Sequence, residues 1–219
     1  MQQILLINPN SSIATTEMMV SIAGSCAGGG VRVVGATAQR SPPMITTVEA
    51  LAASAAEVVE IGVGNHEDYA GIIVSAYGDP GLEALRDKVT IPVVGICEAS
   101  MIEAAAGGRR FGVATVTPEL ADLIEDRARE LDLHHLYSGI RLTPGDPLEL
   151  VRDPARLERE LIVAVRACFE QDGAEAVIIG GGPLGQVAAA IQPLFDQPII
   201  APIPAATRQL LGLLKTSDD

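Results

Sequence analysis

Two stretches of this chain, about 105 residues apart, repeat one pattern: an apolar run that ends in small residues and a tight turn. GIIVSA at residues 71–76 corresponds to AVIIGG at 176–181, and the turn GDPGL at 78–82 corresponds to GPL at 182–184. A second pair, IPVVGI at 91–96 and QPIIAP at 197–202, follows at nearly the same offset. A duplicated strand-turn-helix plan predicts two similar lobes, and a cleft between such lobes is suited to a small molecule.

Short β-branched runs alternate with longer helical patterns, which is typical of an α/β fold with parallel sheets. Near-continuous apolar runs such as QILLI at 3–7 indicate strands that helices cover on both faces. Strands are predicted at 3–8, 31–37, 70–75, 92–96, 110–116, 136–142, 176–180 and 198–201, and helices at 12–25, 47–63, 80–87, 98–106, 118–131, 154–171, 184–194 and 205–214. GDP at 145–147 is predicted as a loop turn.

We therefore predict two pseudo-symmetric lobes, each a four-stranded parallel sheet flanked by helices, with the active site in the cleft between them. The first lobe is expected to span residues 1–96 and the second 97–204. The C-terminal helix, 205–219, is expected to pack back on the first lobe.

Composition excludes several classes of protein. The 219 residues are 48% hydrophobic, enough for a real core, and the formal charge of −13 argues against nucleic acid or an anionic membrane as partner. No window approaches the roughly 18 to 20 apolar residues that span a bilayer. The three cysteines, Cys26, Cys97 and Cys168, lack paired spacing, so neither a disulfide framework nor a metal site is indicated. We expect a cytoplasmic protein.

Ligands of parallel sheets collect at the carboxyl ends of the strands, and these ends are polar or small here. NPNSS at 8–12 follows the first predicted strand and supplies Asn10 and Ser11, while Thr115 and Thr117 occupy the same place in the second copy. Each segment alone is compatible with a simple turn and helix cap. Their repetition favours a binding role.

The turns of the repeat itself have two interpretations each. Ser75, Ala76, Tyr77 and Asp79 lie in the first turn, where Asp79 either serves the chemistry or caps a helix. The second turn, with Gly181 and Gly182, lets backbone N–H groups approach a ligand closely. It lacks the G-x-G-x-x-G spacing of a dinucleotide site.

Several separate motifs carry a resemblance to a known family: INPNSS at 7–12, GDPGL at 78–82, PVVG at 92–95 followed by Glu98 and Ala99, and FGV at 111–113 followed by Thr115. In order and spacing the chain resembles the hydantoin and allantoin racemase branch of the aspartate/glutamate racemase superfamily. The resemblance implies two pseudo-symmetric lobes and catalysis without a cofactor. It also implies two cysteines, one per lobe, which exchange the α-proton on opposite faces of the substrate.

The positions that match those two cysteines are Ala76 and Gly181. Neither side chain carries a proton, so the two-thiol mechanism does not transfer to this sequence. Candidate replacements for the two thiols are Cys97 and Glu98. The alternative role of Cys97 is to pack in the core, and that of Glu98 is to cap a helix. Asp79 and Tyr77 lie next to the vacant first position. Thr46 matches a pocket-lining segment of the family, or starts the next helix.

These observations predict an isomerase of the hydantoin racemase group that acts on a small carboxylate, amide or ureide compound by a non-thiol mechanism. Two alternatives stay open: a lyase or hydrolase in which Asp79 or Glu98 activates water, and a catalytically silent binding protein. We expect a homo-oligomer.

Overall fold

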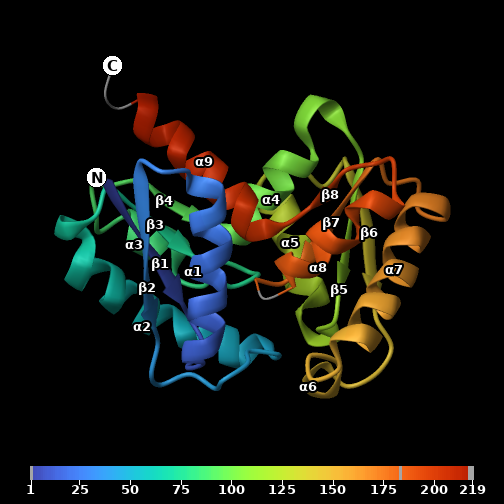
Figure 1. The fold of residues 1–219 in the computed structure, drawn as a ribbon, viewed down its shortest axis with the longest axis horizontal. Helices are drawn as coiled ribbons and strands as arrows, with labels where there is room; N and C mark the ends of the chain where they lie inside the picture. Colours follow the sequence, from blue (N-terminus) through green and yellow to red (C-terminus); the bar gives the residue numbers. More distant parts are fainter. Residues whose placement is uncertain (1, 183, 217–219) are drawn as a thin grey trace.

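The computed structural model describes residues 2–182 and 184–216, which form two α/β halves side by side (Figure 1). The first half contains β1 (Gln2–Asn8), α1 (Ile13–Ala27), β2 (Val31–Thr37), α2 (Val48–Asn65), β3 (Gly71–Val74), α3 (Leu82–Arg86), β4 (Val93–Gly95) and α4 (Ile96–Ala104). The second contains β5 (Phe111–Thr115), α5 (Ala121–Glu130), β6 (Tyr137–Leu142), α6 (Pro147–Leu150), α7 (Pro154–Glu170), β7 (Ala176–Gly180), α8 (Gly185–Ile191), β8 (Ile199–Ile200) and α9 (Pro202–Thr216). Short 3₁₀ turns occupy His66–Asp68, Ala106–Gly108, Pro118–Leu120 and Gln192–Leu194.

Both sheets are parallel and have the same strand order. The first runs β2-β1-β3-β4 and the second β6-β5-β7-β8, so each strand of one half has its equivalent in the other. The predicted pair of four-stranded parallel sheets is confirmed. β3 and β7, which carry the repeated apolar run, are inner strands next to β1 and β5.

The inner strands are apolar because helices cover both faces of each sheet. Ile4, Leu5, Leu6 and Ile7 of β1 are all buried, and every residue of β3, β5 and β7 is buried as well. The edge strands β2 and β6 are only partly buried.

Side-chain caps begin three of the helices at the positions that the sequence marks. Ser12 accepts a hydrogen bond from Thr15 N at the start of α1, and Thr47 accepts one from Ala50 N at the start of α2. Asp153 accepts from Arg156 N ahead of Pro154, the first residue of α7.

The prediction of a loop turn at residues 145–147 is wrong in one respect, because Asp146 caps a short helix. Its carboxylate accepts hydrogen bonds from Leu148 N and Glu149 N, which starts α6 at Pro147. An Asp-Pro pair suits a loop turn and a helix start equally well, so composition alone does not separate them.

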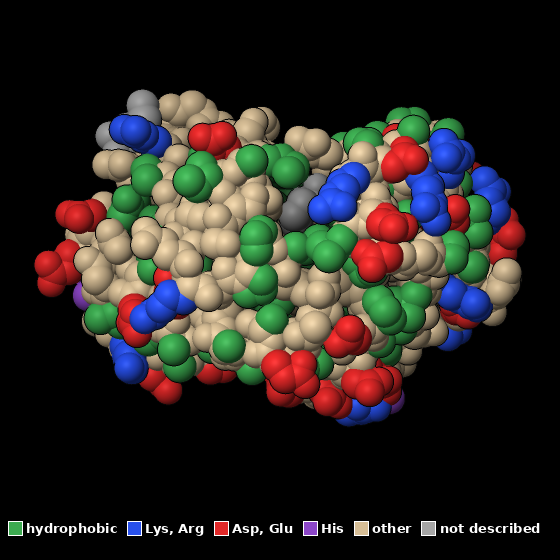
Figure 2. Space-filling view, turned by 90° about the horizontal axis from the view of Figure 1, so that it is seen from below, with side chains coloured by type: hydrophobic (Ala, Val, Ile, Leu, Met, Phe, Trp, Pro, Cys, Tyr) green, Lys and Arg blue, Asp and Glu red, His purple; other side chains and the backbone are tan. Residues whose placement is uncertain are grey.

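The surface carries the acidic excess of the sequence. Figure 2 shows acidic side chains scattered over one face, and hydrophobic side chains along its middle, between the two halves. Within residues 2–182 and 184–216, no helix has the length and apolar character needed to cross a membrane.

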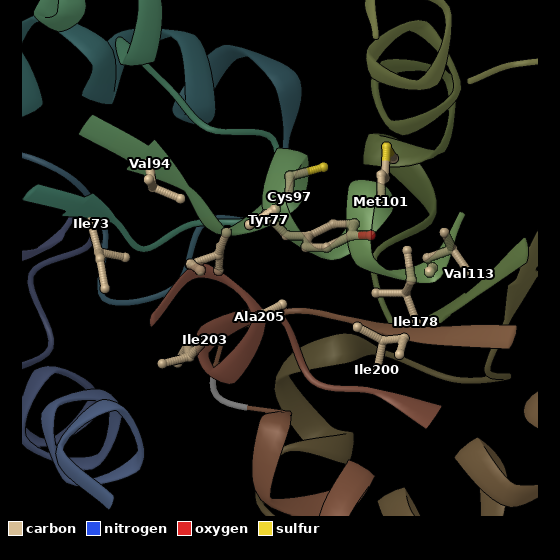
Figure 3. Packing of buried hydrophobic residues seen from close by; sticks show 14 of the residues in the cluster. Ile73, Tyr77, Val94, Cys97, Met101, Val113, Ile178, Ile200, Ile203 and Ala205 are labelled. Atoms are coloured by element: carbon tan, nitrogen blue, oxygen red, sulfur yellow. The ribbon is translucent and has the colours of Figure 1, made fainter. Parts of the chain in front are cut away.

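Two equivalent helices, α4 and α9, pack on each other at the centre of the molecule (Figure 1). α9 also packs on α1, β3 and β4, while α4 reaches β7 and α5. One buried cluster therefore runs through both halves and includes Ile73 and Val94 from the first sheet with Val113 and Ile178 from the second (Figure 3). The division of the chain between residues 96 and 97 stays a prediction, and residues 217–219 lie outside the described part of the chain.

Gly95 is required by a close approach at the start of α4. A Cβ atom at this position would overlap the carboxyl group of Asp79, which lies directly against the Gly95 backbone. A side chain at residue 95 therefore has to displace Asp79 or the end of β4.

We predict that Gly95→Ala lowers the free energy of unfolding by about 1–3 kcal/mol, the usual cost of overpacking a tight site. Urea unfolding measures the effect. Gly212→Ala is the matched control, because residue 212 is an exposed helical glycine with nothing within 4 Å of its missing Cβ. That variant should gain about 0.5–1 kcal/mol from helix propensity. Equal stability of the two variants would contradict the crowding at Gly95.

Candidate active site between the lobes

A cavity of about 450 Å³ opens at the carboxyl ends of the inner strands of both sheets. The first half supplies the segments that follow β1 and β3, and the second half those that follow β5 and β7, as expected for parallel sheets. The lining residues are Asn10, Thr15, Met18, Pro43, Met44, Ile45, Leu51, Ser75, Ala76, Tyr77, Val116, Thr117, Leu120, Val151, Pro154, Leu157, Gly180, Gly181, Gly182, Leu184, Gln186 and Val187.

Most of the expected binding residues border this cavity. They are Asn10, Ser75, Ala76, Tyr77, Thr117, Gly181 and Gly182. Three others do not. Ser11 and Thr46 lie outside the lining, and Thr115 is fully buried, with its hydroxyl donating to Gly180 O at 2.6 Å. Pro183 lies outside the described residues.

Two polar lining residues were not predicted from the sequence. Thr15 lies in the first turn of α1, and Gln186 lies in the first turn of α8. Each residue lies in the first turn of the helix that follows a polar or glycine-rich strand end. That spacing was the only signal in the sequence, because the first turn of a helix has the same sequence pattern whether or not it faces a cleft.

Ala76 and Gly181, which end the repeated runs, border the same cavity from opposite halves. Their backbones differ. Gly181 has φ +150°, and a Cβ atom there would meet Leu184 Cδ1 at 3.0 Å. Ala76 already carries a Cβ atom, and its carbonyl oxygen accepts a hydrogen bond from Asp79 N at 3.0 Å. We call the turn that begins at Ala76 the first tip and the turn that begins at Gly181 the second tip. The first tip can therefore hold a larger side chain more easily than the second.

Tyr77 reaches from the first half into the shared core. Its ring lies among Met101, Val113 and Ile178 (Figure 3), and a Cβ atom at Gly180 would meet Tyr77 Cε1 at 3.1 Å. The phenol oxygen is buried and has no hydrogen-bond partner among the described residues. Burial raises the pKa of Tyr77 well above its ordinary value, so the phenol stays protonated.

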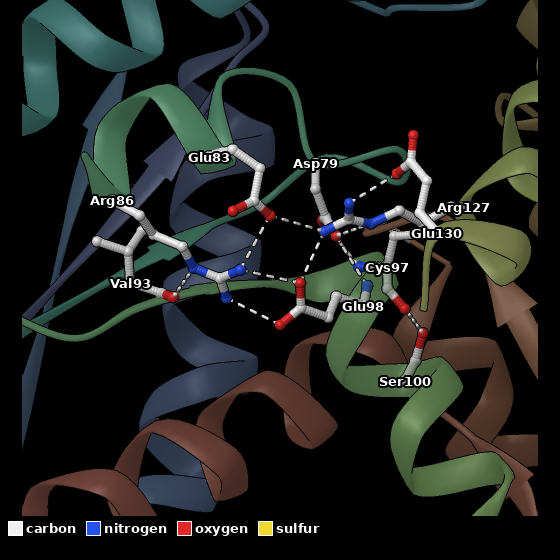
Figure 4. Close-up of polar contacts among 9 residues, drawn as sticks. All are labelled: Asp79, Glu83, Arg86, Val93, Cys97, Glu98, Ser100, Arg127 and Glu130. Carbon is white, nitrogen blue, oxygen red and sulfur yellow. Dashed lines mark hydrogen bonds and ion pairs between the residues drawn. The ribbon is translucent and has the colours of Figure 1, made fainter. Parts of the chain in front are cut away.

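Asp79, a predicted catalytic residue, lies outside the cavity lining and caps α4. Its carboxylate oxygens accept hydrogen bonds from Cys97 N at 2.9 Å and Glu98 N at 2.7 Å (Figure 4). The side chain is buried, and this burial raises the pKa of Asp79 to about 7 against the lowering effect of the two N–H donors and of Arg127. Asp79 therefore caps a helix, but that helix is α4 and not α3, which follows Asp79 in the sequence and has no side-chain cap.

Cys97 and Glu98 also lie outside the cavity lining. Both belong to α4, which begins at Ile96 and not at the predicted residue 98. Cys97 is fully buried, and burial raises the pKa of its thiol well above the ordinary value. The Glu98 carboxylate lies between two guanidinium groups, with Arg86 Nη2 at 2.8 Å and Arg127 Nη2 at 2.7 Å. A catalytic role for these three residues remains a prediction without support from their positions.

The described lining of the cavity carries no carboxylate, thiol, imidazole, amine or guanidinium group. Its polar groups are amides, hydroxyls and backbone, and Tyr77 is the one lining side chain that titrates. Nor do residues 2–182 and 184–216 hold a group of three or more His, Cys, Asp or Glu side chains placed to bind a metal ion.

Comparison with known proteins agrees with this architecture. Residues 4–210 match the Asp/Glu/Hydantoin racemase family. The chain belongs to this family. It is 30% identical over 207 residues to a hydantoin racemase of Pseudomonas sp. (strain NS671), with 94% of this chain and 83% of that protein covered. A hydantoin racemase of Rhizobium meliloti is 29% identical over 213 residues, covering 95% and 87% of the two chains.

Solved structures share the fold of this chain. The allantoin racemase from Klebsiella pneumoniae superposes with a TM-score of 0.93 at 24% identity, covering 99% of this chain and 89% of that one. The predicted family, enzyme class and two-lobed architecture are thereby confirmed.

We predict that the stability contribution of Asp79 falls as pH rises. Its folded pKa of about 7 exceeds the ordinary 3.8, so the contribution is complete below pH 3.8 and is lost as pH rises through 7. Asp79→Asn does not titrate and loses one acceptor, which costs about 1–3 kcal/mol. The stability gap between wild type and variant should therefore narrow from pH 4 to pH 8, measured by urea unfolding.

Glu57→Gln provides a control of opposite sign. Although burial raises the pKa of Glu57, hydrogen bonds from Gln39 N and Arg40 N bring it below the ordinary value. Its contribution is present at neutral pH and is lost as pH falls. A gap that widens with pH for Asp79→Asn would contradict the assigned shift.

A further prediction concerns the two tips. Ala76→Cys should leave the free energy of unfolding within about 1 kcal/mol of wild type, whereas Gly181→Cys should lose about 1–3 kcal/mol through backbone strain and contact with Leu184. Urea unfolding of both variants in a Cys26→Ser background tests this. Equal tolerance at the two positions would show that the second tip relaxes freely.

Proposed function

We propose that this chain is a cofactor-independent isomerase that racemises a hydantoin- or allantoin-like ureide by a non-thiol mechanism. One observation carries the proposal: an uncharged cavity lies between the two tips of a racemase-family fold, bordered by Ala76 on one side and Gly181 on the other. Relatives named as hydantoin racemases support the substrate class.

The absence of charge from the described lining favours a neutral ring over an amino acid. An ionised carboxylate taken into this cavity would lose its hydration without gaining a counter-ion, which costs several kcal/mol. A hydantoin or other cyclic ureide presents only N–H and C=O groups. These match the amides of Asn10 and Gln186 and the hydroxyls of Ser75 and Thr117.

The apolar part of the lining supports a substituent on the ring. Met44, Ile45, Leu157 and Val187 border the cavity from both halves, so an alkyl or aryl group would be buried there. The volume of about 450 Å³ lies within the range of roughly 300–1,000 Å³ typical of small-molecule sites.

In this proposal the proton is moved by water. Tyr77 stays a protonated phenol, so no described lining side chain acts as a base near neutral pH. A hydroxide or water molecule in the cavity removes the α-proton, the electron pair enters the adjacent carbonyl as an enolate, and water returns a proton to the other face. Hydroxyl and amide donors at the cavity wall stabilise the enolate oxygen.

Two alternative functions compete with this one. A lyase or hydrolase using Asp79 or Glu98 gains nothing from their positions, since neither borders the cavity. A catalytically silent binding protein is favoured by one observation, the lack of a titrating base in the described lining.

The proposal includes a cytoplasmic location and a homo-oligomeric state. The location is supported by Cys26, Cys97 and Cys168, which are all free, because unpaired thiols are typical of reducing compartments.

The deciding experiment incubates the protein in heavy water with single enantiomers of 5-alkyl hydantoins and of allantoin. We expect α-deuterium to enter as optical rotation is lost, and the rate to rise about tenfold per pH unit between pH 6 and 9, as first-order dependence on hydroxide requires. A plateau near neutral pH would instead reveal an ionising catalytic group. Thr117→Val, which removes a lining hydroxyl, should slow exchange.

The outcomes separate the alternatives. A new product without deuterium exchange would replace the isomerase with a lyase or hydrolase. Saturable binding of a hydantoin without exchange or product would leave the binding protein.

A further inference from the structure

One face of α5, in the second half, rests on the loop that forms the first tip. Leu123 and Arg127 lie four residues apart on this helix and therefore point the same way. Both reach the loop of residues 76–79 across the boundary between the halves.

Leu123 makes the apolar part of this contact. Gly78 has φ +121° and lies between Leu51 of α2 and Leu123 of α5. A Cβ atom there would meet Leu51 Cδ2 at 2.6 Å and Leu123 Cδ2 at 2.9 Å. The loop is thus held between one side chain from its own half and one from the other.

Arg127 makes the charged part. Its side chain is 12% exposed and meets four carboxylates (Figure 4). Nη2 lies 2.7 Å from Glu98 and 3.4 Å from Glu83, Nη1 lies 2.9 Å from Glu130, and Nε faces Asp79 at 3.9 Å. Within the described residues, Nε has no hydrogen-bond partner, so its interaction with Asp79 is purely one of charge.

The charge balance makes Arg127 hard to replace. The cluster of Asp79, Glu83, Glu98 and Glu130 holds four carboxylates against two guanidiniums, Arg86 and Arg127. Arg86 donates to Glu83, Glu98 and Val93 O, all within the first half. Arg127 is therefore the cation that ties Asp79 and Glu98 to the second half.

Asp79 passes this constraint on to the tip. Its N–H donates to Ala76 O, and its carboxylate accepts hydrogen bonds from the N–H groups of Cys97 and Glu98, the second and third residues of α4. A displacement of Asp79 therefore also moves the turn with Ser75 and Ala76, which form part of the cavity wall.

We propose that Arg127 is a positioning residue for the active site. From the second half it holds Asp79, and through Asp79 it fixes the first tip against the cavity. The catalytic consequence rests on the proposed function, whereas the structural consequence does not.

The test places a reporter thiol at the tip, using Ala76→Cys with Cys26→Ser in the full-length protein. The rate of modification by a water-soluble disulfide reagent is followed at position 76 and at Cys168 by peptide mass analysis. Cys168 is fully buried in the second half and reacts only after unfolding, so it serves as an internal reference. Arg127→Gln should raise the rate at position 76 several-fold and leave that of Cys168 unchanged, with Arg127→Lys giving an intermediate rate.

Two control variants bracket the proposal. Arg86→Gln weakens the same carboxylate cluster at Glu83 and Glu98, and Arg129→Gln removes a half-exposed arginine of α5 that pairs with Glu125 and Asp126. Both should leave the rate at position 76 near that of the parent. With the native Ala76, Arg127→Gln should lower kcat for deuterium exchange by about 10- to 100-fold, the range expected for a slightly misplaced site, while KM changes less.

Two results would overturn the proposal. One is an unchanged rate at position 76 in folded Arg127→Gln and Arg127→Lys. The other is a parallel rise at positions 76 and 168, which means that Arg127 contributes only to global stability. If Arg127→Gln does not fold, Arg127→Lys decides. If the wild-type protein exchanges no deuterium, the proposed function fails, and the thiol rates still judge the position of Arg127.

Discussion

The structure depends on one buried carboxylate. Asp79 lies in the turn after β3, and its side chain packs against the backbone of Gly95. Its carboxylate accepts hydrogen bonds from Cys97 N and Glu98 N in the first turn of α4. This contact lets α4 begin directly after β4, without a connecting loop, and so places α4 where it packs on α9. The sheet edge, the tip and the central pair of helices are therefore fixed by the same group. The cost of burying this carboxylate is offset in part by the hydrogen bonds from Cys97 N and Glu98 N.

Charge and cavity are kept apart in this molecule. The ionised groups near the cavity lie behind the first tip, around Arg127. There they form ion pairs with one another, and some of them are exposed to solvent. The cavity on the other side of the tip is neutral along its described lining. In a neutral pocket, no charged side chain of the lining competes for the hydrogen bonds to a ligand. Selectivity then depends on hydrogen-bond pattern and shape more than on net charge.

The sequence predicted what depends on local pattern. The eight strands, the parallel sheets and the lining residues at strand ends, such as Asn10 and Gly181, follow from apolar runs and the repeat. The catalytic candidates were chosen by nearness to a strand end, yet the chain turns back within three residues of Ala76, and Asp79 finds its partners 18 and 19 positions later. The contact with Arg127 joins residues from different halves. No local pattern encodes such a pairing, because it exists only once both halves have folded.

The central position of α9 affects the order in which the chain can fold. The helix that covers α1, β3 and β4 follows every other described element in the sequence, and it also packs on α4. Until α9 has been synthesised and has packed, the first half exposes the apolar surface that α9 covers. Folding from the N-terminus, the usual course for independent domains, is therefore incomplete here. The two halves look like separate units in the sheet order, but the core that they share is complete only when α9 has packed.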